Sequence, residues 1–88
     1  MKIKQGFSLK EINGQSIIVC DKNIYPNFNA VIALTDTSVL LWNMLINGTA
    51  TKEEMLNELL HKFDISTVLA LNNIDVFVRT LNENGILE

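Results

Sequence analysis

Leu34-Thr-Asp-Thr-Ser-Val-Leu-Leu-Trp-Asn-Met-Leu45 is the stretch of this chain that decides its fold. It begins where a short apolar run, residues 30–34, predicts a strand. Thr35 or Asp36 can then cap a helix that extends to about Ile46, because their side-chain oxygens accept N–H groups of a first helical turn. Three large apolar side chains recur on one face of that helix: Leu41, Trp42 and Leu45. The stretch therefore predicts a strand that leads directly into a buried helix.

The residues before this stretch predict a β-hairpin and a loop. Residues 7–12 and 15–20 are short runs rich in apolar and β-branched side chains. Asn13-Gly14 lies between them, and this pair favours a type I′ turn, which needs positive φ at both central positions. Residues 21–29 contain the only proline, Pro26, among several Asn residues and therefore predict a loop.

Two further helices are predicted after the stretch. Thr51 and Glu54 have the spacing of a capping box, so a helix begins after Thr51. The apolar positions of that helix are Met55 or Leu56, Leu59, Leu60 and Phe63. Asp64 or Ser66 begins the last helix, which extends to about Asn84, with Gly85 as its C′ residue. The main apolar stripe of the last helix is Leu71, Ile74, Phe77, Val78 and Leu81.

Length and composition indicate one small globular domain that spans residues 1–88. The apolar content of 48% is enough for a single core. No apolar run approaches the roughly 20 residues that cross a membrane, and the N-terminal residues lack the apolar segment of a signal peptide. Cys20 is the only cysteine, so it has no disulfide partner within the chain. We therefore expect a cytoplasmic protein without a membrane partner.

The charged residues argue against nucleic-acid binding. The formal net charge is −3, and the seven Lys and Arg residues are scattered along the chain. The last helix has one basic residue, Arg79, alongside Asp75 and Glu83. Contacts from basic side chains to phosphates supply most of the affinity for DNA, and this chain has few basic side chains to make them. A winged-helix DNA-binding or transcription accessory module stays open as the alternative function.

No group of residues points to catalysis. His61 and Cys20 are the only residues of their kind and lie far apart in the sequence, whereas a metal site needs three or four ligands. Glu53 and Glu54 lie at the start of a predicted helix, where the helix dipole already explains acidic side chains. We expect no catalytic residue, no metal site and no cofactor.

Several pieces of the chain, taken in order, resemble a known family. They are Leu34-Thr-Asp-Thr-Ser38, Leu41-Trp42, Gly48-x-x-Thr51-x-x-Glu54, Leu59-x-x-x-Phe63-Asp64-Ile65, and Asn73-Ile74-x-x-Phe77-Val78-x-x-Leu81-x-x-x-Gly85-Ile86-Leu87. Their order and spacing resemble the PqqD-like family of peptide-binding domains, also called RiPP precursor recognition elements. The chain departs from the family pattern at three positions. Thr35 stands where the family has Asn, Ser38 where it has Gly, and Asn73 where it has an acidic residue.

The resemblance implies a fold and a function. With the strands and helices predicted above, it implies an α+β domain in which a three-stranded antiparallel sheet is followed by three helices, in a winged-helix-like arrangement. It also implies a non-catalytic chaperone that binds the leader segment of a ribosomally made precursor peptide. The chaperone presents the leader to a modifying enzyme such as a radical SAM protein, a cyclase or a leader peptidase. We expect a monomer or a weak homodimer. A generic protein-interaction domain is a third reading.

The resemblance places the leader as an added strand beside residues 30–34, in a cleft formed with the last helix. The strand residues of this site are Ala30, Val31, Ile32, Ala33 and Leu34. Successive residues of a helix are 100° apart, so one flank beside Phe77 presents Leu69, Asn73, Val76 and Thr80. That flank has apolar residues outside the main stripe, although scattered apolar residues are normal on protein surfaces. The sequence does not determine whether Val31 and Ala33 or their neighbours direct their backbone groups towards the leader.

Overall fold

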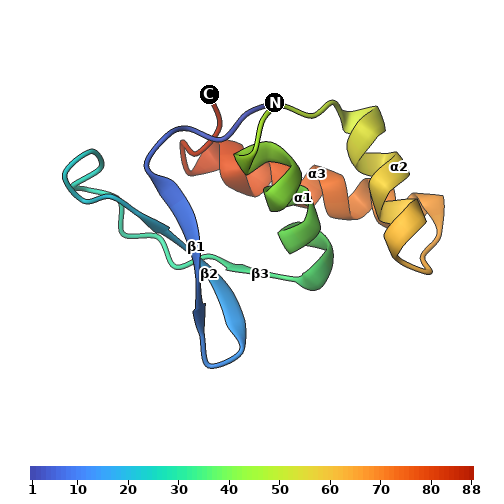
Figure 1. Cartoon of the computed structure of the whole chain (residues 1–88), viewed down its shortest axis with the longest axis horizontal. Coiled ribbons are helices and arrows are strands. Elements are labelled where there is room, and N and C mark those ends of the chain that lie inside the picture. Colours follow the sequence, from blue (N-terminus) through green and yellow to red (C-terminus); the bar gives the residue numbers. More distant parts are fainter.

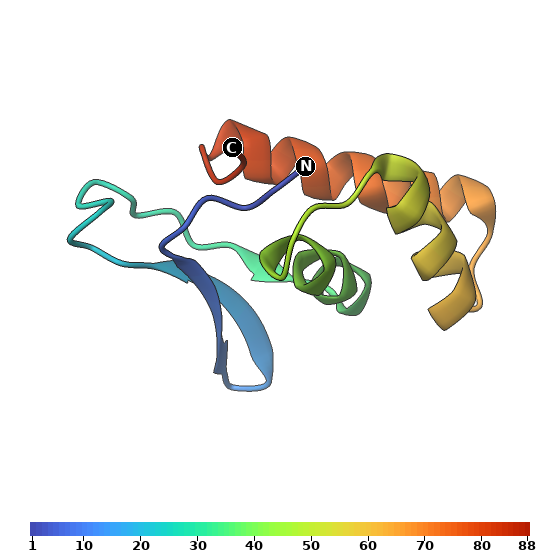
Figure 2. The same ribbon diagram turned by 45° about the horizontal axis from the view of Figure 1, so that its top comes forward.

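A computed structural model describes all 88 residues of the chain. Three strands are followed by three helices (Figure 1). The strands are β1 (Phe7–Ile12), β2 (Gln15–Cys20) and β3 (Ala33–Leu34), and the helices are α1 (Asp36–Ile46), α2 (Lys52–Lys62) and α3 (Thr67–Glu83). Figure 2 shows α3 lying across the other two helices, while the β1–β2 hairpin projects away from them. The predicted α+β class and element order are confirmed.

The sheet has the order β1-β2-β3, and both pairs of strands are antiparallel. β1 and β2 pair along their whole length, from Phe7 opposite Cys20 to Ile12 opposite Gln15. Asn13 and Gly14 have φ values of 52° and 78°, as the predicted type I′ turn requires. β3 is therefore an edge strand, with β2 on one side only.

β3 is shorter than the sequence predicts. The prediction was a strand over residues 30–34, but the regular ladder with β2 covers Ala33 and Leu34 alone. One more hydrogen bond, from Ile18 N–H to the Ile32 carbonyl at 3.0 Å, follows the ladder towards the loop. Phe28 packs edge-on against Phe7, with 5.2 Å between ring centroids. Residues 30–32 are thus not part of the strand, although local β propensity predicts that they are.

Side-chain caps fix where each helix begins. The Oγ1 atom of Thr35 accepts the Ser38 N–H at 3.4 Å in α1, and the Oγ atom of Ser66 accepts the Leu69 N–H at 3.1 Å in α3. Thr51 and Glu54 form the predicted capping box at the start of α2. The Thr51 backbone N–H donates to the Glu54 carboxylate and thereby lowers the pKa of that carboxyl group.

The core gathers apolar side chains from every helix and from the base of the hairpin. Its buried members are Ile3, Phe7, Ile18, Leu41, Trp42, Leu45, Ala50, Met55, Leu59, Ala70, Ile74, Phe77, Leu81 and Ile86. The predicted α1 face is therefore confirmed. On α3, however, Ala70 is buried while Leu71 is only half-buried, so the buried stripe begins one residue earlier than predicted. On α2, Leu60 is 38% exposed, because the buried contacts of that helix end with Met55 and Leu59.

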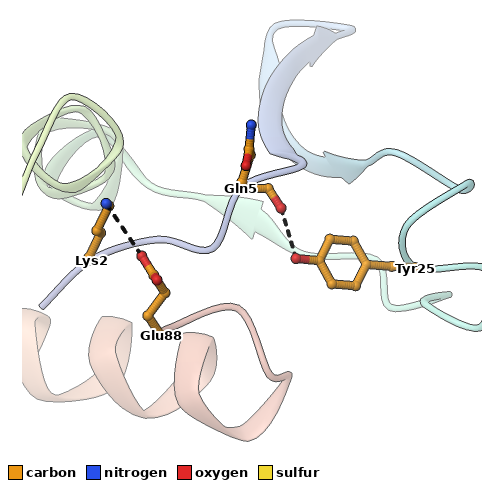
Figure 3. A network of polar contacts seen from close by, with 4 residues as sticks. All are labelled: Lys2, Gln5, Tyr25 and Glu88. Atoms are coloured by element: carbon orange, nitrogen blue, oxygen red, sulfur yellow. Dashed lines mark hydrogen bonds and ion pairs between the residues drawn. The ribbon is translucent and has the colours of Figure 1, made fainter.

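The N-terminal segment ties the sheet to the end of α3. Ile3 and Leu87 form an antiparallel bridge, supported by the Lys4 N–H bond to the Ile86 carbonyl at 2.8 Å. Figure 3 shows the surroundings of this segment: Lys2 pairs with Glu88 at 3.7 Å, and the Tyr25 hydroxyl donates to the Gln5 carbonyl at 2.8 Å. The exposed ion pair adds little stability. The backbone bonds and the buried Ile3 side chain hold the segment in place.

Gly6 is the glycine whose replacement should cost most stability. Its φ is +101°, and a Cβ atom added there would lie 2.9 Å from the Tyr25 ring. We expect Gly6→Ala to lower the free energy of unfolding by about 1–3 kcal/mol, because both the backbone and the contact become strained. Urea denaturation measures this change. Gly48→Ala is the matched control, since a Cβ atom at Gly48 meets nothing within 4 Å. Equal stability of the two variants would contradict the prediction.

Candidate functional site

The free edge of β3 presents backbone groups that no strand pairs with. The Ile18 N–H binds the Ile32 carbonyl, so the backbone groups of Ile32 face β2. Because the N–H and C=O of successive strand residues point to opposite sides, the groups of Ala33 face away from β2. Val31 has the same orientation wherever the chain is extended. The register therefore directs the backbone groups of Ala33 outwards, whereas Val31 precedes the paired part of the strand.

A cleft of about 170 Å³ lies between β3 and α3. It brings together residues from three elements: Ile32, Ala33, Leu34, Thr35, Ser38, Asn73, Val76, Phe77, Thr80 and Leu81. None of these side chains carries a charge, and most are apolar. Val76 is 44% exposed on the α3 side, whereas Phe77 is buried and forms part of the floor. The cleft can therefore receive an uncharged, apolar side chain beside a strand edge.

Seven of the ten residues proposed from the sequence lie in this cleft. They are Ile32, Ala33, Leu34, Asn73, Val76, Phe77 and Thr80. Ala30 and Val31 line a different cleft, on the β2 side of the chain segment before β3. Leu69 is 46% exposed in the first turn of α3 and does not line the cleft. The proposal that these residues bind a peptide stays a prediction.

The proposed set did not contain Thr35, Ser38 or Leu81, which also line the cleft. Thr35 and Ser38 enter because no loop separates β3 from α1, so the cap of the helix adjoins the strand edge. Their hydroxyl groups lie 3.1 Å apart. The sequence indicated this proximity, because the helix cap at Thr35 directly follows the predicted strand. Leu81 belongs to the predicted core stripe, and its buried side chain also lines the cleft.

The ionisable side chains do not form a reactive centre around the cleft. His61 is exposed in the last turn of α2, and Cys20 is half-buried at the end of β2. Asp75 is the charged neighbour of Val76 in the sequence, and its carboxylate pairs with Lys52 at 2.8 Å on the exposed surface. No three His, Cys, Asp or Glu side chains come together closely enough to hold a metal ion. No helix is long and apolar enough to cross a membrane.

Two other clefts are larger than the one beside α3. One of about 420 Å³ is lined by the N-terminal segment, from Lys2 to Phe7, with Ile46 and Glu88. Its walls are mostly polar and offer no row of apolar side chains. The other, of about 260 Å³, lies between β2 and residues 28–31. Volume alone does not identify the site, and only the cleft beside α3 combines a free strand edge with a helix flank.

Comparison with known proteins identifies a family and a similar solved structure. Residues 23–87 match the family described as Coenzyme PQQ synthesis protein D (PqqD). The chain belongs to the PqqD family. No curated protein matches the sequence of this PqqD-family member. Among solved structures, it is similar to that of TbiB1 in complex with the TbiA(beta) leader peptide, with a TM-score of 0.74 and 17% sequence identity. The similarity covers 100% of this chain and 95% of TbiB1.

The PqqD match confirms the family resemblance read from the motifs. It covers β3, all three helices and the residues that line the cleft, and it leaves the β1–β2 hairpin outside the matched segment. The TbiB1 structure extends the likeness of the fold over the whole chain, including that hairpin. The departures at Thr35, Ser38 and Asn73 therefore do not change the architecture. All three residues lie at the cleft.

Proposed function

We propose that this PqqD-family protein is a non-catalytic chaperone that binds the leader segment of a ribosomally made precursor peptide. The leader adds as a strand along the free edge of β3, which is β-augmentation. The observation that carries the proposal is the outward-facing backbone of Ala33 beside an uncharged cleft. The solved complex of the similar protein TbiB1 with a leader peptide supports it.

The energetics require both the edge and the cleft. Each backbone hydrogen bond contributes about 1 kcal/mol net, and ordering a flexible peptide offsets several such bonds. Burial of one large apolar side chain contributes a further 1.5–3 kcal/mol, roughly, at about 25 cal/mol per Å². The uncharged lining around Val76 and Phe77 suits such a side chain. We therefore expect the segment of the leader that enters the cleft to be apolar.

The protein presents the bound leader to a modifying enzyme, for which we propose a radical SAM protein, a cyclase or a leader peptidase. Presentation requires that one partner holds the leader while another acts on the rest of the precursor. We place this step in the cytoplasm, where precursor peptides are made. The DNA-binding alternative is not favoured, since α3 offers Arg79 as its only basic side chain.

Replacement of Val76 by aspartate tests the cleft. A carboxylate at this position must lose solvent when an apolar leader side chain covers it. We expect Val76→Asp to weaken binding by about 1–3 kcal/mol, which is roughly 5- to 150-fold. The measurement is calorimetric titration with synthetic peptides that cover the leader of a precursor peptide, once a neighbouring gene identifies one.

Val68→Asp is the matched control for this experiment. Val68 is also on α3 and is 79% exposed, but it lies in the first turn and lines none of the clefts. The same change of charge at Val68 should leave the affinity within about twofold, since surface substitutions usually change free energies by less than about 0.5 kcal/mol. If both variants bind like the wild type, the leader does not occupy the cleft.

A further inference from the structure

The ladder of hydrogen bonds between β2 and β3 is shorter than the two segments allow. Extension of the observed pairing, with Ser16 opposite Leu34 and Ile17 opposite Ala33, would place Cys20 opposite Ala30. No backbone hydrogen bond joins Cys20 to Ala30 in either direction. The Ile32 N–H likewise makes no bond to the Ile18 carbonyl, although the reverse bond exists at 3.0 Å. Three ladder bonds that the register allows are therefore not formed.

An open cleft occupies the place of the missing ladder. The 260 Å³ cleft has β2 residues on one side, including Val19 and Cys20, and residues 28–31 on the other. Val31 is 86% exposed, which makes it the most exposed large apolar residue of the chain. The separation of the two walls thus leaves apolar surface in water and backbone groups without protein partners. Both costs favour pairing of residues 30–32 with β2 once these residues are held in an extended conformation.

Only three residues separate the anchor of the loop, Phe28, from Ile32. Phe28 is fixed against Phe7, its N–H binds the Tyr25 carbonyl at 3.2 Å, and Lys22 Nζ donates to the Phe28 carbonyl. Ile32 is already held by its bond from Ile18. Residues 29–31 contain no proline, and the β-branched Val31 suits a strand. A change confined to these residues can therefore extend β3.

We propose that leader binding completes β3, so that residues 30–32 close onto β2 while the leader pairs with their other edge. This inference rests on the proposed function. A leader can bond to the outward groups of Val31 only when that residue is extended. In an extended chain, the groups of Ala30 and Ile32 point at β2, opposite Cys20 and Ile18. Leader binding thus favours the hydrogen bonds between residues 30–32 and β2, although the leader does not take part in them.

The consequence is a site that is assembled by its ligand. The inner ladder and the leader strand stabilise each other, and such coupling is reciprocal by thermodynamic linkage. Closure also covers the cleft beside Cys20. The sequence pattern of residues 30–34, which predicts a strand, then describes the bound state better than the free one.

Hydrogen exchange at single amides tests the inference. The protein is followed by NMR with and without a synthetic leader peptide that calorimetric titration has shown to bind. We expect the peptide to slow exchange at least tenfold at Cys20, Ala30 and Ile32, whose N–H groups face away from the leader. Slowing at Val31 and Ala33 alone would overturn strand completion but keep the proposed function. Equal protection of the inner amides without peptide would also overturn completion, and binding without any effect on β3 would overturn both.

The thiol of Cys20 provides an independent measurement. It is the only cysteine and lines the cleft that closure covers. Its reaction with an aromatic disulfide reagent should slow at least fivefold when the leader peptide saturates the wild-type protein. An unchanged rate in the saturated complex would show that the cleft stays open.

The Ala30→Pro variant distinguishes completion of the β2–β3 ladder from direct contact with the leader. Proline at this position removes the N–H that would donate to the Cys20 carbonyl, and its ring keeps the segment from closing onto β2, while the outward groups of Val31 and Ala33 remain. The variant should still bind the peptide, several-fold more weakly, but the Cys20 amide and thiol should no longer be protected. Ala30→Val retains the N–H group and is the matched control, in which the peptide should still protect the Cys20 amide. Full protection of Cys20 in the proline variant would overturn the inference.

Discussion

Replacement of Trp42 by alanine is expected to lower the free energy of unfolding by about 3–5 kcal/mol. Trp42 is the largest side chain of the core and is only 2% exposed, between Leu41 and Leu45 on the buried part of α1. Alanine would leave a cavity that the surrounding helices fill only in part. A domain of this size has a total stability of roughly 4–13 kcal/mol, so the loss is a large fraction of the whole.

Urea denaturation followed by circular dichroism measures this loss, because the helices report unfolding without the tryptophan. Trp42→Phe is the matched control and should cost clearly less than Trp42→Ala, since the phenylalanine ring refills part of the space. A Trp42→Ala variant with the wild-type midpoint and slope would show that the side chain is not part of the core.

Proline in place of Ala33 is expected to weaken leader binding about 30- to 150-fold. The variant lacks the outward N–H at the centre of the proposed pairing, and the proline ring fills space that the leader strand needs. A leader carbonyl left without a donor and the steric clash together cost about 2–3 kcal/mol of binding free energy, which corresponds to a 30- to 150-fold weaker affinity. The ladder with β2 should survive, because the backbone groups of Ala33 do not take part in it.

Peptide titration of the Ala33→Pro variant measures the effect, with circular dichroism to verify that the fold is retained. Ala33→Val is the matched control: it adds bulk at the same position but keeps the N–H, so its affinity should fall much less than that of Ala33→Pro. Should a folded Ala33→Pro variant bind as tightly as Ala33→Val, leader recognition does not use the β3 edge.

Much of the architecture could be predicted because its signals are local. The Asn13-Gly14 turn, the capping box of Thr51 and Glu54, and the Ser66 cap each depend on residues a few positions apart. The short β3 could not be predicted, since the point at which the chain begins to pair with β2 is a tertiary property. The burial of Ala70 instead of Leu71 has a similar origin, because the stripe on α3 follows the position of its neighbours.

The candidate site was predicted in part for the same reason. Val76, Phe77 and Thr80 reach the cleft because helical geometry fixes which residues share a flank. Leu69 shares that flank, but it lies too close to the start of α3 to meet β3, and the length of the opposing strand is a tertiary property. The orientation of Ala33 required the register with β2, which no single segment encodes.

In the proposed complex, the brevity of β3 determines how far a bound precursor can reach. A strand edge with two regularly paired residues holds only a short segment of a leader, even after extension by a few residues. The remainder of the precursor is then a tether. A flexible tether of about 20 residues has an r.m.s. span near 25 Å and a limit near 70 Å. If a modifying enzyme docks beside the domain, as proposed, such a tether would hold the modifiable residues near it at roughly millimolar effective concentration, at many positions along the peptide.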